Sequence, residues 1–340
     1  MASVLVDRHP QEPLTLAPEE VNTFPAKSSG QLTGVTLLSS SSLSFPALNL
    51  QAPFDAIKTL FDHLAASPET AAQLNQTYPA RGIYKAAAQW KKDVDQKFTI
   101  DLSPHRLDLI PSELRNHLAP FGFTEVVQFF ENLMETHLPV IMQQIGLLSG
   151  NDFTPLHREQ NVNFRLCDYN PATANPASFN GCGAHRDYGT FSIIFQDGTS
   201  GLEIESTSTP GQWVPVPPTS TVILAGWSAY ILSGAKLHAV RHRVRRIPGK
   251  RRLSAVFFVA PDLHVKLQPV ALQDPSNADP AAVVACNKRF SECIRQGTFD
   301  IAWFKDVMGK KWRWREGNLE IADADVEVTQ DDEIEKLVHA

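Results

Sequence analysis

Apolar residues in the first half of the chain recur three and four positions apart, which is the period of an amphipathic helix. Residues 52–66 show this pattern clearly, and Pro53 suits the first turn of a helix there. A longer stretch with the same period follows Thr124, which suits an N-cap, and runs to about Leu148. Pro139 lies inside this stretch and predicts a kink, because proline cannot donate the helical hydrogen bond.

From about residue 160 the pattern changes to alternation of apolar and polar positions, which predicts strands. The predicted strands cover residues 163–169, 191–195, 221–224 and 252–258. Short strands separated by Gly, Pro and Asp turns favour an all-β sandwich or barrel. Helical patterns return at Ala281–Arg295 and Asp300–Val307, so the predicted fold is mainly β with added helices.

These patterns divide the chain into four regions. We expect an extended or flexible N-terminus over residues 1–30 and a mainly helical region over 31–150. Residues 151–315 form the β core with its C-terminal helices, and 316–340 form an acidic, flexible tail.

Composition adds limits on the class of protein. The 340 residues carry a formal charge of −6, and neither this nor the pI of about 6.0 suggests a general affinity for nucleic acid or anionic membrane. Four cysteines without a CxxC pair indicate free thiols in a reducing compartment. They are Cys167, Cys182, Cys286 and Cys293. The first residues lack an apolar stretch, and no apolar run approaches the length of a membrane span, so we expect no secretory signal, no membrane span and a cytoplasmic location.

The candidate chemistry lies in the second half of the chain. His185 and Asp187 are two apart, so on a strand they share one face. With a later histidine, His238 or His242, they offer two imidazoles and one carboxylate, the ligand set of a non-haem Fe(II) oxygenase. Further on, RLS places Arg252 and a serine on one face, which suits a cosubstrate that ends in a carboxylate.

The chain resembles the 2-oxoglutarate-dependent Fe(II) dioxygenases of the isopenicillin-N-synthase-like family. The matching segments are AHRDYGTFSIIFQDGTSGLEI, WVPVPP, HRV and RLSAVFF. The resemblance covers residues 120–315 well and 45–120 more loosely. It implies a double-stranded β-helix, or jelly roll, flanked by α-helices, with Fe(II) as cofactor and 2-oxoglutarate and O2 as cosubstrates.

The resemblance also implies roles for single residues. It favours His242 over His238 as the third iron ligand beside His185 and Asp187. It assigns 2-oxoglutarate to Arg252, Ser254 and Tyr169. The family usually has asparagine two residues before this tyrosine, whereas Cys167 stands there in this chain.

Candidate substrate residues follow from the strand period. Arg165 shares a face with Tyr169 and suits an anionic or phenolate substrate, with a surface position as the alternative. Arg186 is a second candidate for the same role. Phe191 and Phe258 would form apolar pocket walls, with core packing as the alternative.

The predicted function is oxidation of a C–H bond in a small molecule. The overall character is similar to fungal polyketide-tailoring oxygenases, so we expect an aromatic polyketide or another specialised metabolite. The outcome is hydroxylation or a rearrangement such as ring expansion to a tropolone.

Three alternatives to this function remain. One is an Fe(II) oxidase or cyclase of the same fold that does not use 2-oxoglutarate, and another is a binding module without activity. The third, a nucleic-acid demethylase, is suggested only by seven Lys or Arg between Arg241 and Arg252. We expect no nucleic-acid or membrane partner, and the sequence does not indicate an oligomeric state.

Overall fold

The chain folds into two antiparallel sheets, one of seven strands and one of four. The computed structural model describes residues 35–38, 50–85, 95–172, 174–206, 209–234, 236–270, 300–306 and 308. The larger sheet has the order β1 (Val35–Leu38), β9 (Thr221–Ala225), β6 (Phe191–Gln196), β11 (Arg252–Val259), β4 (Val162–Tyr169), β3 (Phe98–Leu102), β2 (Tyr84–Lys85). The smaller sheet has the order β5 (Asn180–His185), β10 (His242–Arg245), β7 (Leu202–Glu205), β8 (Trp213–Pro215).

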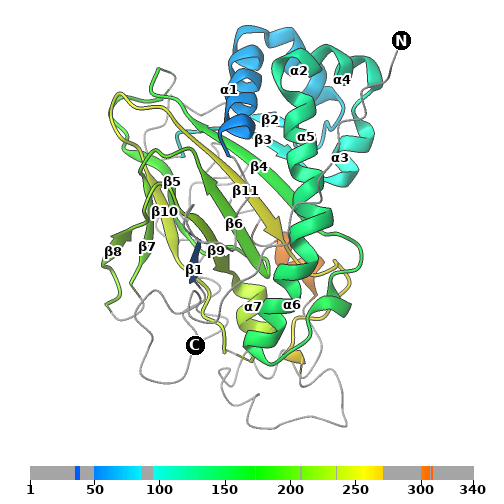
Figure 1. Cartoon of the computed structure of the whole chain (residues 1–340), viewed down its shortest axis with the longest axis vertical. Helices are drawn as coiled ribbons and strands as arrows, with labels where there is room; N and C mark the ends of the chain where they lie inside the picture. Colours follow the sequence, from blue (N-terminus) through cyan, green and yellow to red (C-terminus); the bar gives the residue numbers. More distant parts are fainter. Residues whose placement is uncertain are drawn as a thin grey trace, which may run out of the picture.

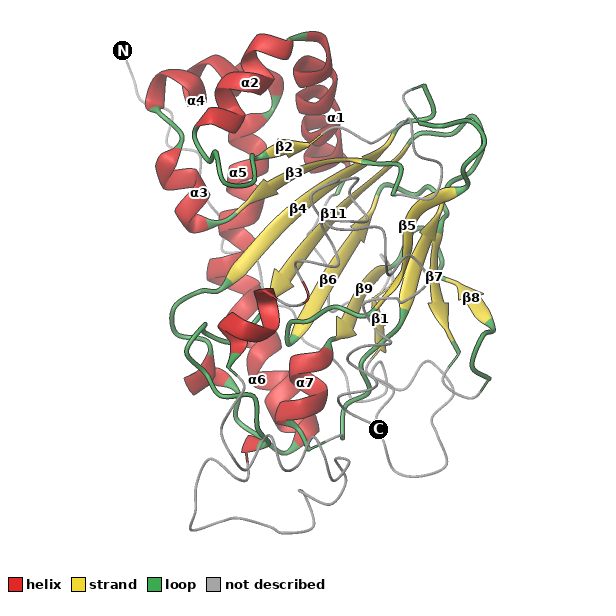
Figure 2. Cartoon of the chain, turned by 180° about the vertical axis from the view of Figure 1, so that it is seen from behind, coloured by secondary structure: helices red, strands yellow, loops and turns green. Residues whose placement is uncertain are grey.

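From β4 onward the chain crosses repeatedly from one sheet to the other. Strands β4, β6, β9 and β11 belong to the larger sheet, and the strands between them in sequence belong to the smaller one (Figure 2). This alternation is the double-stranded β-helix, so the predicted fold class is confirmed. Three strands that precede residue 151, namely β1, β2 and β3, also join the larger sheet.

Helices cover the outer face of the larger sheet (Figure 1). Along β11, Leu253, Ala255 and Phe257 are buried in the same apolar core as Phe130 of the long helix. The rings of Phe130 and Phe257 have centroids 5.9 Å apart. Burial of each such aromatic side chain contributes about 1.5–3 kcal/mol, which holds the helices to the sheet. The helices are α1 (Gln51–Ala66), α2 (Pro68–Gln76), α3 (Pro104–Leu109), α4 (Ser112–Leu118), α5 (Phe123–Asn132), α6 (Leu138–Ser149) and α7 (Trp227–Leu232).

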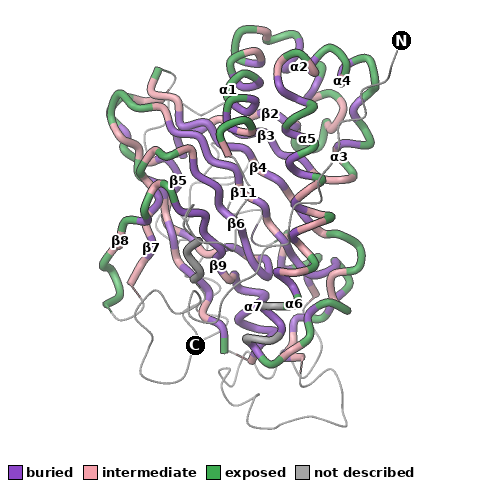
Figure 3. Tube along the Cα trace, viewed as in Figure 1, coloured by how far each residue is buried: buried purple, intermediate pink, exposed green. Residues whose placement is uncertain are grey.

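The other face of the larger sheet packs against the smaller sheet, and we call it the inner face. Buried apolar residues from both sheets form one cluster there: Cys167, Tyr169, Cys182, Ile194, Leu202, Ile204, Val216, Val222, Leu224, Val240 and Val244. The strands are buried along most of their length, whereas the solvent sides of the helices are exposed (Figure 3). Because the odd-numbered residues of β11 pack against the helices, its even-numbered residues point into the space between the sheets.

The strand pairing arranges inner-face residues in rows across the larger sheet. Arg252 pairs with Tyr169, and Ser254 pairs with Cys167 on one side and Gln196 on the other. At the far end of β11, Phe258 pairs with Asn163 of β4 and Ser192 of β6. These rows connect residues from distant parts of the sequence and position the site described below.

The long helix differs from its prediction at its start and in its middle. The predicted cap at Thr124 is wrong, because the helix begins at Phe123 after Gly122, whose φ is 89°. A Cβ at Gly122 would lie 2.6 Å from the Ala56 carbonyl oxygen, so only glycine fits this turn.

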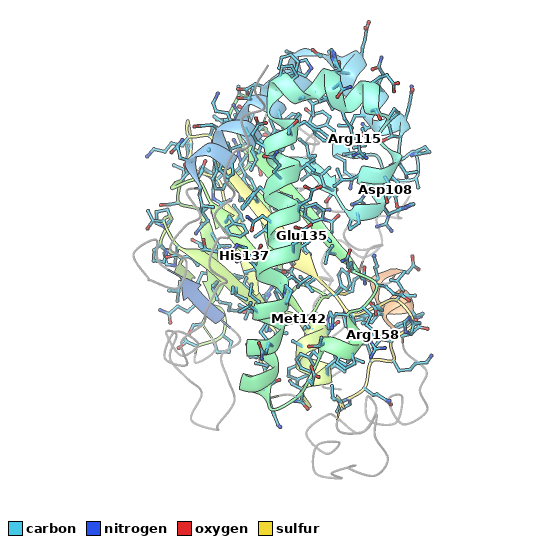
Figure 4. The ribbon with its side chains drawn as sticks, turned by 45° about the vertical axis from the view of Figure 1, so that its right-hand side comes forward. Asp108, Arg115, Glu135, His137, Met142 and Arg158 are labelled. Atoms are coloured by element: carbon cyan, nitrogen blue, oxygen red, sulfur yellow. The ribbon has the colours of Figure 1, made fainter. Side chains whose placement is uncertain are left out.

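In its middle, the long helix changes to a π-helical turn, Leu133–His137, before the first turn of α6 (Figure 4). This turn directly precedes the residues around Pro139, which lacks the backbone donor of a regular helix. His137 and Met142 are buried on the sheet side of the helix, whereas Glu135 is exposed.

Other predicted elements agree with the structure where it describes them. Helix 52–66 corresponds to α1, the four predicted strands correspond to β4, β6, β9 and β11, and residues 301–306 are helical. The predicted N-terminus over 1–30, the helix Ala281–Arg295 and the tail over 316–340 lie outside the described residues. None of the described helices has the length and apolar character needed to cross a membrane.

Candidate metal and cosubstrate site

Three buried side chains converge where β5 and β10 lie side by side. His185 ends β5, His242 begins β10, and the register pairs these two residues directly. Asp187 follows two residues after His185, with Oδ1 3.4 Å from Nε2 of His185 and Oδ2 3.9 Å from Nε2 of His242. The ligand atoms of all three lie within 4.8 Å of one another. His238 is not a member of this group.

Backbone hydrogen bonds fix the two imidazole rings. Nδ1 of His185 donates to the Gly183 carbonyl at 2.8 Å, and Nδ1 of His242 donates to the Val240 carbonyl at 3.1 Å. With the proton on Nδ1, each Nε2 presents its lone pair toward Asp187. Such outer contacts orient metal-binding histidines and select their tautomer.

Asp187 is held ionised despite its burial. Burial alone would raise its pKa, but the adjacent imidazoles of His242 and His185 and the hydroxyl of Ser192 lower it below the ordinary value. The Ser192 hydroxyl donates to Oδ2 at 2.5 Å. An ionised carboxylate beside two neutral imidazoles is the facial ligand set of non-haem Fe(II), so these residues fit that ion.

Close backbone packing fixes the loop that carries Asp187. The Trp227 amide donates to the Asp187 carbonyl at 2.8 Å, which joins this loop to the start of α7. A Cβ at Gly226 would lie 2.3 Å from the Gly189 carbonyl oxygen and 2.7 Å from that of Asp187. Glycine is therefore required at position 226 for this approach.

Arg252 provides a buried cation on the inner face without a carboxylate partner among the described residues. Its Nη2 donates to Gln196 Oε1 at 3.1 Å, and its Nε donates to the Thr199 carbonyl at 3.2 Å. Its guanidinium carbon lies 5.2 Å from the centre of the Tyr169 ring. Nη1 is buried and has no hydrogen-bond partner within the described part of the chain. A carboxylate would satisfy this donor and neutralise the charge.

Tyr169 and Ser254 share the inner face with Arg252, and the strand period predicted this for Ser254. Burial raises the pKa of Tyr169, so its phenol keeps its proton and can donate a hydrogen bond. Ser254 is buried one row further along β11, opposite Cys167. This set of two hydroxyl donors and one guanidinium fits the distal carboxylate of 2-oxoglutarate.

The structure adds a buried pair that the sequence analysis missed. Lys97 Nζ lies 3.0 Å from Asp95 Oδ2 and 3.0 Å from Cys182 Sγ. Lys97 directly precedes β3 and continues its inner-face period, which also contains Thr99 and Asp101. The alternation of polar residues at positions 97, 99 and 101 could have indicated that Lys97 lies on the inner face, but no strand was predicted over these residues.

Arg165 lies on the inner face as predicted, but an acidic residue engages it. Its Nε and Nη2 donate to the two carboxylate oxygens of Asp101 at 2.7 and 3.1 Å. Burial alone would raise the pKa of Asp101, but Arg165 and Lys85 lower it well below the ordinary value. The sequence analysis did not identify Asp101, because its partner lies on another strand.

The other substrate candidates lie in different environments. Arg186 donates from Nε to the Ala239 carbonyl at 3.0 Å and lies over the Trp227 ring, 5.2 Å from its centre. Phe258 lies on the inner face, opposite Ser192. Phe191 is 1% exposed and packs in the core shared with the helices.

Acidic residues pair with several cations of the basic run. Arg241 contacts Glu205 at 3.2 Å, and Arg243 contacts Glu203 at 2.6 Å. Arg251 makes contacts of 2.7 Å with Asp168 and 2.6 Å with Asp62. Several basic residues of this run therefore have a structural role, because they form ion pairs on the sheets.

The comparisons with known proteins point to one family. The family described as the 2OG-Fe(II) oxygenase superfamily matches residues 159–261. This range contains His185, Asp187, His242, Arg252, Ser254 and Tyr169. This part of the chain is therefore a domain of the 2OG-Fe(II) oxygenase superfamily.

The curated relatives include hydroxylases and dioxygenases. Scopoletin 8-hydroxylase of Arabidopsis thaliana is 28% identical over 190 residues, 54% of this chain and 49% of the relative. The 2-oxoglutarate-dependent dioxygenase tropC of Talaromyces stipitatus is 33% identical over 137 residues, 39% of this chain and 40% of that protein. The chain spans about half the length of the first curated relatives that it matches.

A solved structure shares the fold. The crystal structure of a Neurospora crassa protein in complex with alpha-KG and thymine superposes with a TM-score of 0.56 at 20% identity. The superposition covers 74% of this chain and 82% of the Neurospora crassa protein. The two chains therefore have the same arrangement of sheets and helices over most of their length.

Proposed function

We propose that this chain is an Fe(II)- and 2-oxoglutarate-dependent dioxygenase that oxidises a C–H bond of a small molecule. The observation that carries the proposal is a buried two-histidine, one-carboxylate group together with Arg252, a buried cation whose partners among the described residues are all neutral. The superfamily match over residues 159–261 and the hydroxylases and dioxygenases among the relatives support it.

The side chains would divide the work of binding between them. His185, Asp187 and His242 would hold the iron, and Arg252, Ser254 and Tyr169 would hold the distal carboxylate of 2-oxoglutarate. When bound, iron with 2-oxoglutarate and O2 supplies the oxidant, while 2-oxoglutarate is converted to succinate and CO2.

The protein itself contributes orientation and a dry inner face. The backbone carbonyls of Gly183 and Val240 keep the Nε2 atoms of the two histidines free of protons, and Ser192 orients the Asp187 carboxylate. The buried apolar residues between the sheets exclude water, which strengthens the charge contacts of Arg252.

The finer parts of the proposal concern substrate and setting. An aromatic polyketide or similar specialised metabolite is the proposed substrate, in the cytoplasm, with hydroxylation or ring expansion as the outcome. The likeness to the fungal dioxygenase tropC supports this assignment. The pairing of basic residues with Glu203, Glu205 and Asp168 favours a small molecule over a nucleic acid as partner.

The test is anaerobic addition of Fe(II) and then 2-oxoglutarate to the metal-free chain. We expect a weak visible charge-transfer band from the chelate, which fades when O2 is admitted and succinate is released. Iron binding without this band, and turnover without succinate, would replace the proposal with an oxidase that does not use 2-oxoglutarate. A chain that binds no iron would be a binding module.

A further inference from the structure

A group of positive charges lies on the inner face beside the candidate metal site. The group consists of Lys85, Arg106, Arg165 and Lys305, and Asp101 is the carboxylate among them. Asp101 is 1% exposed and contacts Arg165 at 2.7 Å and Lys85 at 3.6 Å. In the part of the chain that the structure describes, one carboxylate therefore stands among these four cations, and it forms ion pairs with two of them.

Among the described residues, Arg106 and Lys305 donate hydrogen bonds only to neutral groups, although the charge of Arg106 also acts on Asp101. Nη1 of Arg106 donates to Asn163 Oδ1, and its guanidinium carbon lies 4.9 Å from the centre of the Tyr78 ring. Nε of Arg106 is buried and has no hydrogen-bond partner in the same part of the chain. Lys305 Nζ donates to Asn161 Oδ1 at 3.1 Å.

Like charges also act on one another in this group. Burial lowers the pKa of Lys305, and the charges of Arg81 and Arg106 lower it further. A partly buried cation that is repelled by its neighbours and lacks an acidic partner is costly to hold in its charged form. An anion at this place would relieve both the burial cost and the repulsion.

Two sets of contacts connect these cations to the metal ligands across the inner face. Asn163, which holds Arg106, lies in one row with Phe258 and Ser192, and Ser192 donates to the metal ligand Asp187. Two strand spacings separate the ends of this row, which is about 10 Å.

The second set of contacts involves the helical residues 301–306. The ring of Phe304, the neighbour of Lys305, lies 6.5 Å from the ring of Tyr188, which follows Asp187 in the chain. The charges of Arg106 and Arg165 also act on Tyr188.

We propose that Arg106 and Lys305 bind a carboxylate of the substrate, so that the substrate class is small carboxylic acids with an apolar body. The apolar part of the substrate would lie against the Phe258 side chain, because Phe258 stands between Asn163, which binds Arg106, and Ser192. Arg165 is then a positioning residue, because its Nε and Nη2 donate to Asp101. This inference rests on the proposed dioxygenase function and names the substrate class of the same site.

The test measures the preference for acids over their uncharged amides. Benzoate, salicylate and 2-naphthoate, each paired with its amide, are titrated calorimetrically into the full chain loaded anaerobically with Fe(II) and 2-oxoglutarate. The wild-type chain should bind acids roughly tenfold or more tightly than amides, as expected for charge-assisted contacts. Arg106→Gln with Lys305→Gln should remove the preference.

The matched control is Lys250→Gln, which removes an exposed positive charge beside a turn. It should keep the preference for acids. The double variant must also keep the wild-type thermal unfolding midpoint and the chelate band; if it does not, the single variants Arg106→Lys and Lys305→Gln are compared instead. An equal affinity for acids and amides in the wild-type chain, including binding of neither, would overturn the inference, as would an unchanged preference in the variants.

Failure of the proposed function gives a different result. A chain that forms no chelate band fails before any acid is added. A chain that forms the band, releases succinate and shows no preference for acids remains a dioxygenase with another substrate class. Repeating the titration with metal-free chain reports on the cations alone.

Discussion

Replacement of Arg252 by glutamine tests the cosubstrate site most directly. The wild-type guanidinium has one buried donor, Nη1, without a partner among the described residues, and its charge is not neutralised by a carboxylate there. Loss of one charge-assisted hydrogen bond costs about 1.5–3 kcal/mol. Because 1.4 kcal/mol corresponds to a tenfold change, the dissociation constant of 2-oxoglutarate should rise about tenfold to a hundredfold.

Iron affinity should hardly change in Arg252→Gln, because Arg252 contacts Gln196, Thr199 and Tyr169 and none of the metal ligands. Titration of the chelate band gives the affinity for 2-oxoglutarate, and competition with a chelator gives the affinity for iron. Lys250→Gln serves as the control for loss of one positive charge. A folded Arg252→Gln variant with unchanged 2-oxoglutarate affinity would refute the assigned role, and parallel loss of iron would show a structural effect instead.

Three further predictions concern the ligands, their loop and the buried acid. His242→Ala should abolish iron binding in a calorimetric titration, whereas His238→Ala should not; equal loss in both would mean that the third ligand is misassigned. Gly226→Ala should weaken iron binding about tenfold or more and lower the unfolding midpoint, because the new Cβ would displace the Asp187 loop; wild-type iron affinity would contradict the close approach. Asp101 has a pKa below its ordinary value of 3.8, so its contribution to stability is complete above about pH 4 and is lost as the pH falls through the folded pKa. In urea unfolding, the difference between the wild-type chain and Asp101→Asn should therefore shrink below pH 4, and a difference independent of pH would count against this account.

The predictable part of this molecule follows from local periods. Strand β11 was predictable because its apolar and polar residues alternate, and the same alternation placed Arg252 and Ser254 on one face. Helix α1 was predictable because its apolar face and Pro53 both lie within one short segment. The ligand set was predictable as chemistry, but the choice of His242 over His238 needed the family resemblance.

The features that sequence analysis missed depend on contacts between distant segments. Asp101 and Arg165 are 64 residues apart and meet because β3 pairs with β4. The close approach of the Ala56 backbone requires glycine at position 122, where the long helix begins. Nothing in the sequence around Gly122 indicates this contact. Lys305 comes close to Arg106 only in the folded chain, so no pattern in the sequence could indicate a shared role.

The backbone carbonyls that receive the histidine Nδ1 protons have a consequence for how the site can evolve. Gly183 and Val240 each lie two residues before the histidine that they hold, so each ring is supported by the main chain of its own segment. Side chains around the two rings can change without altering which nitrogen faces the iron. Asp187 lacks this protection, because a side-chain hydroxyl, that of Ser192, donates to it. Substitutions of pocket residues therefore leave the proton of each imidazole on Nδ1, whereas a substitution of Ser192 would affect Asp187 directly. The pocket can thus change its substrate while the metal ligands keep their arrangement.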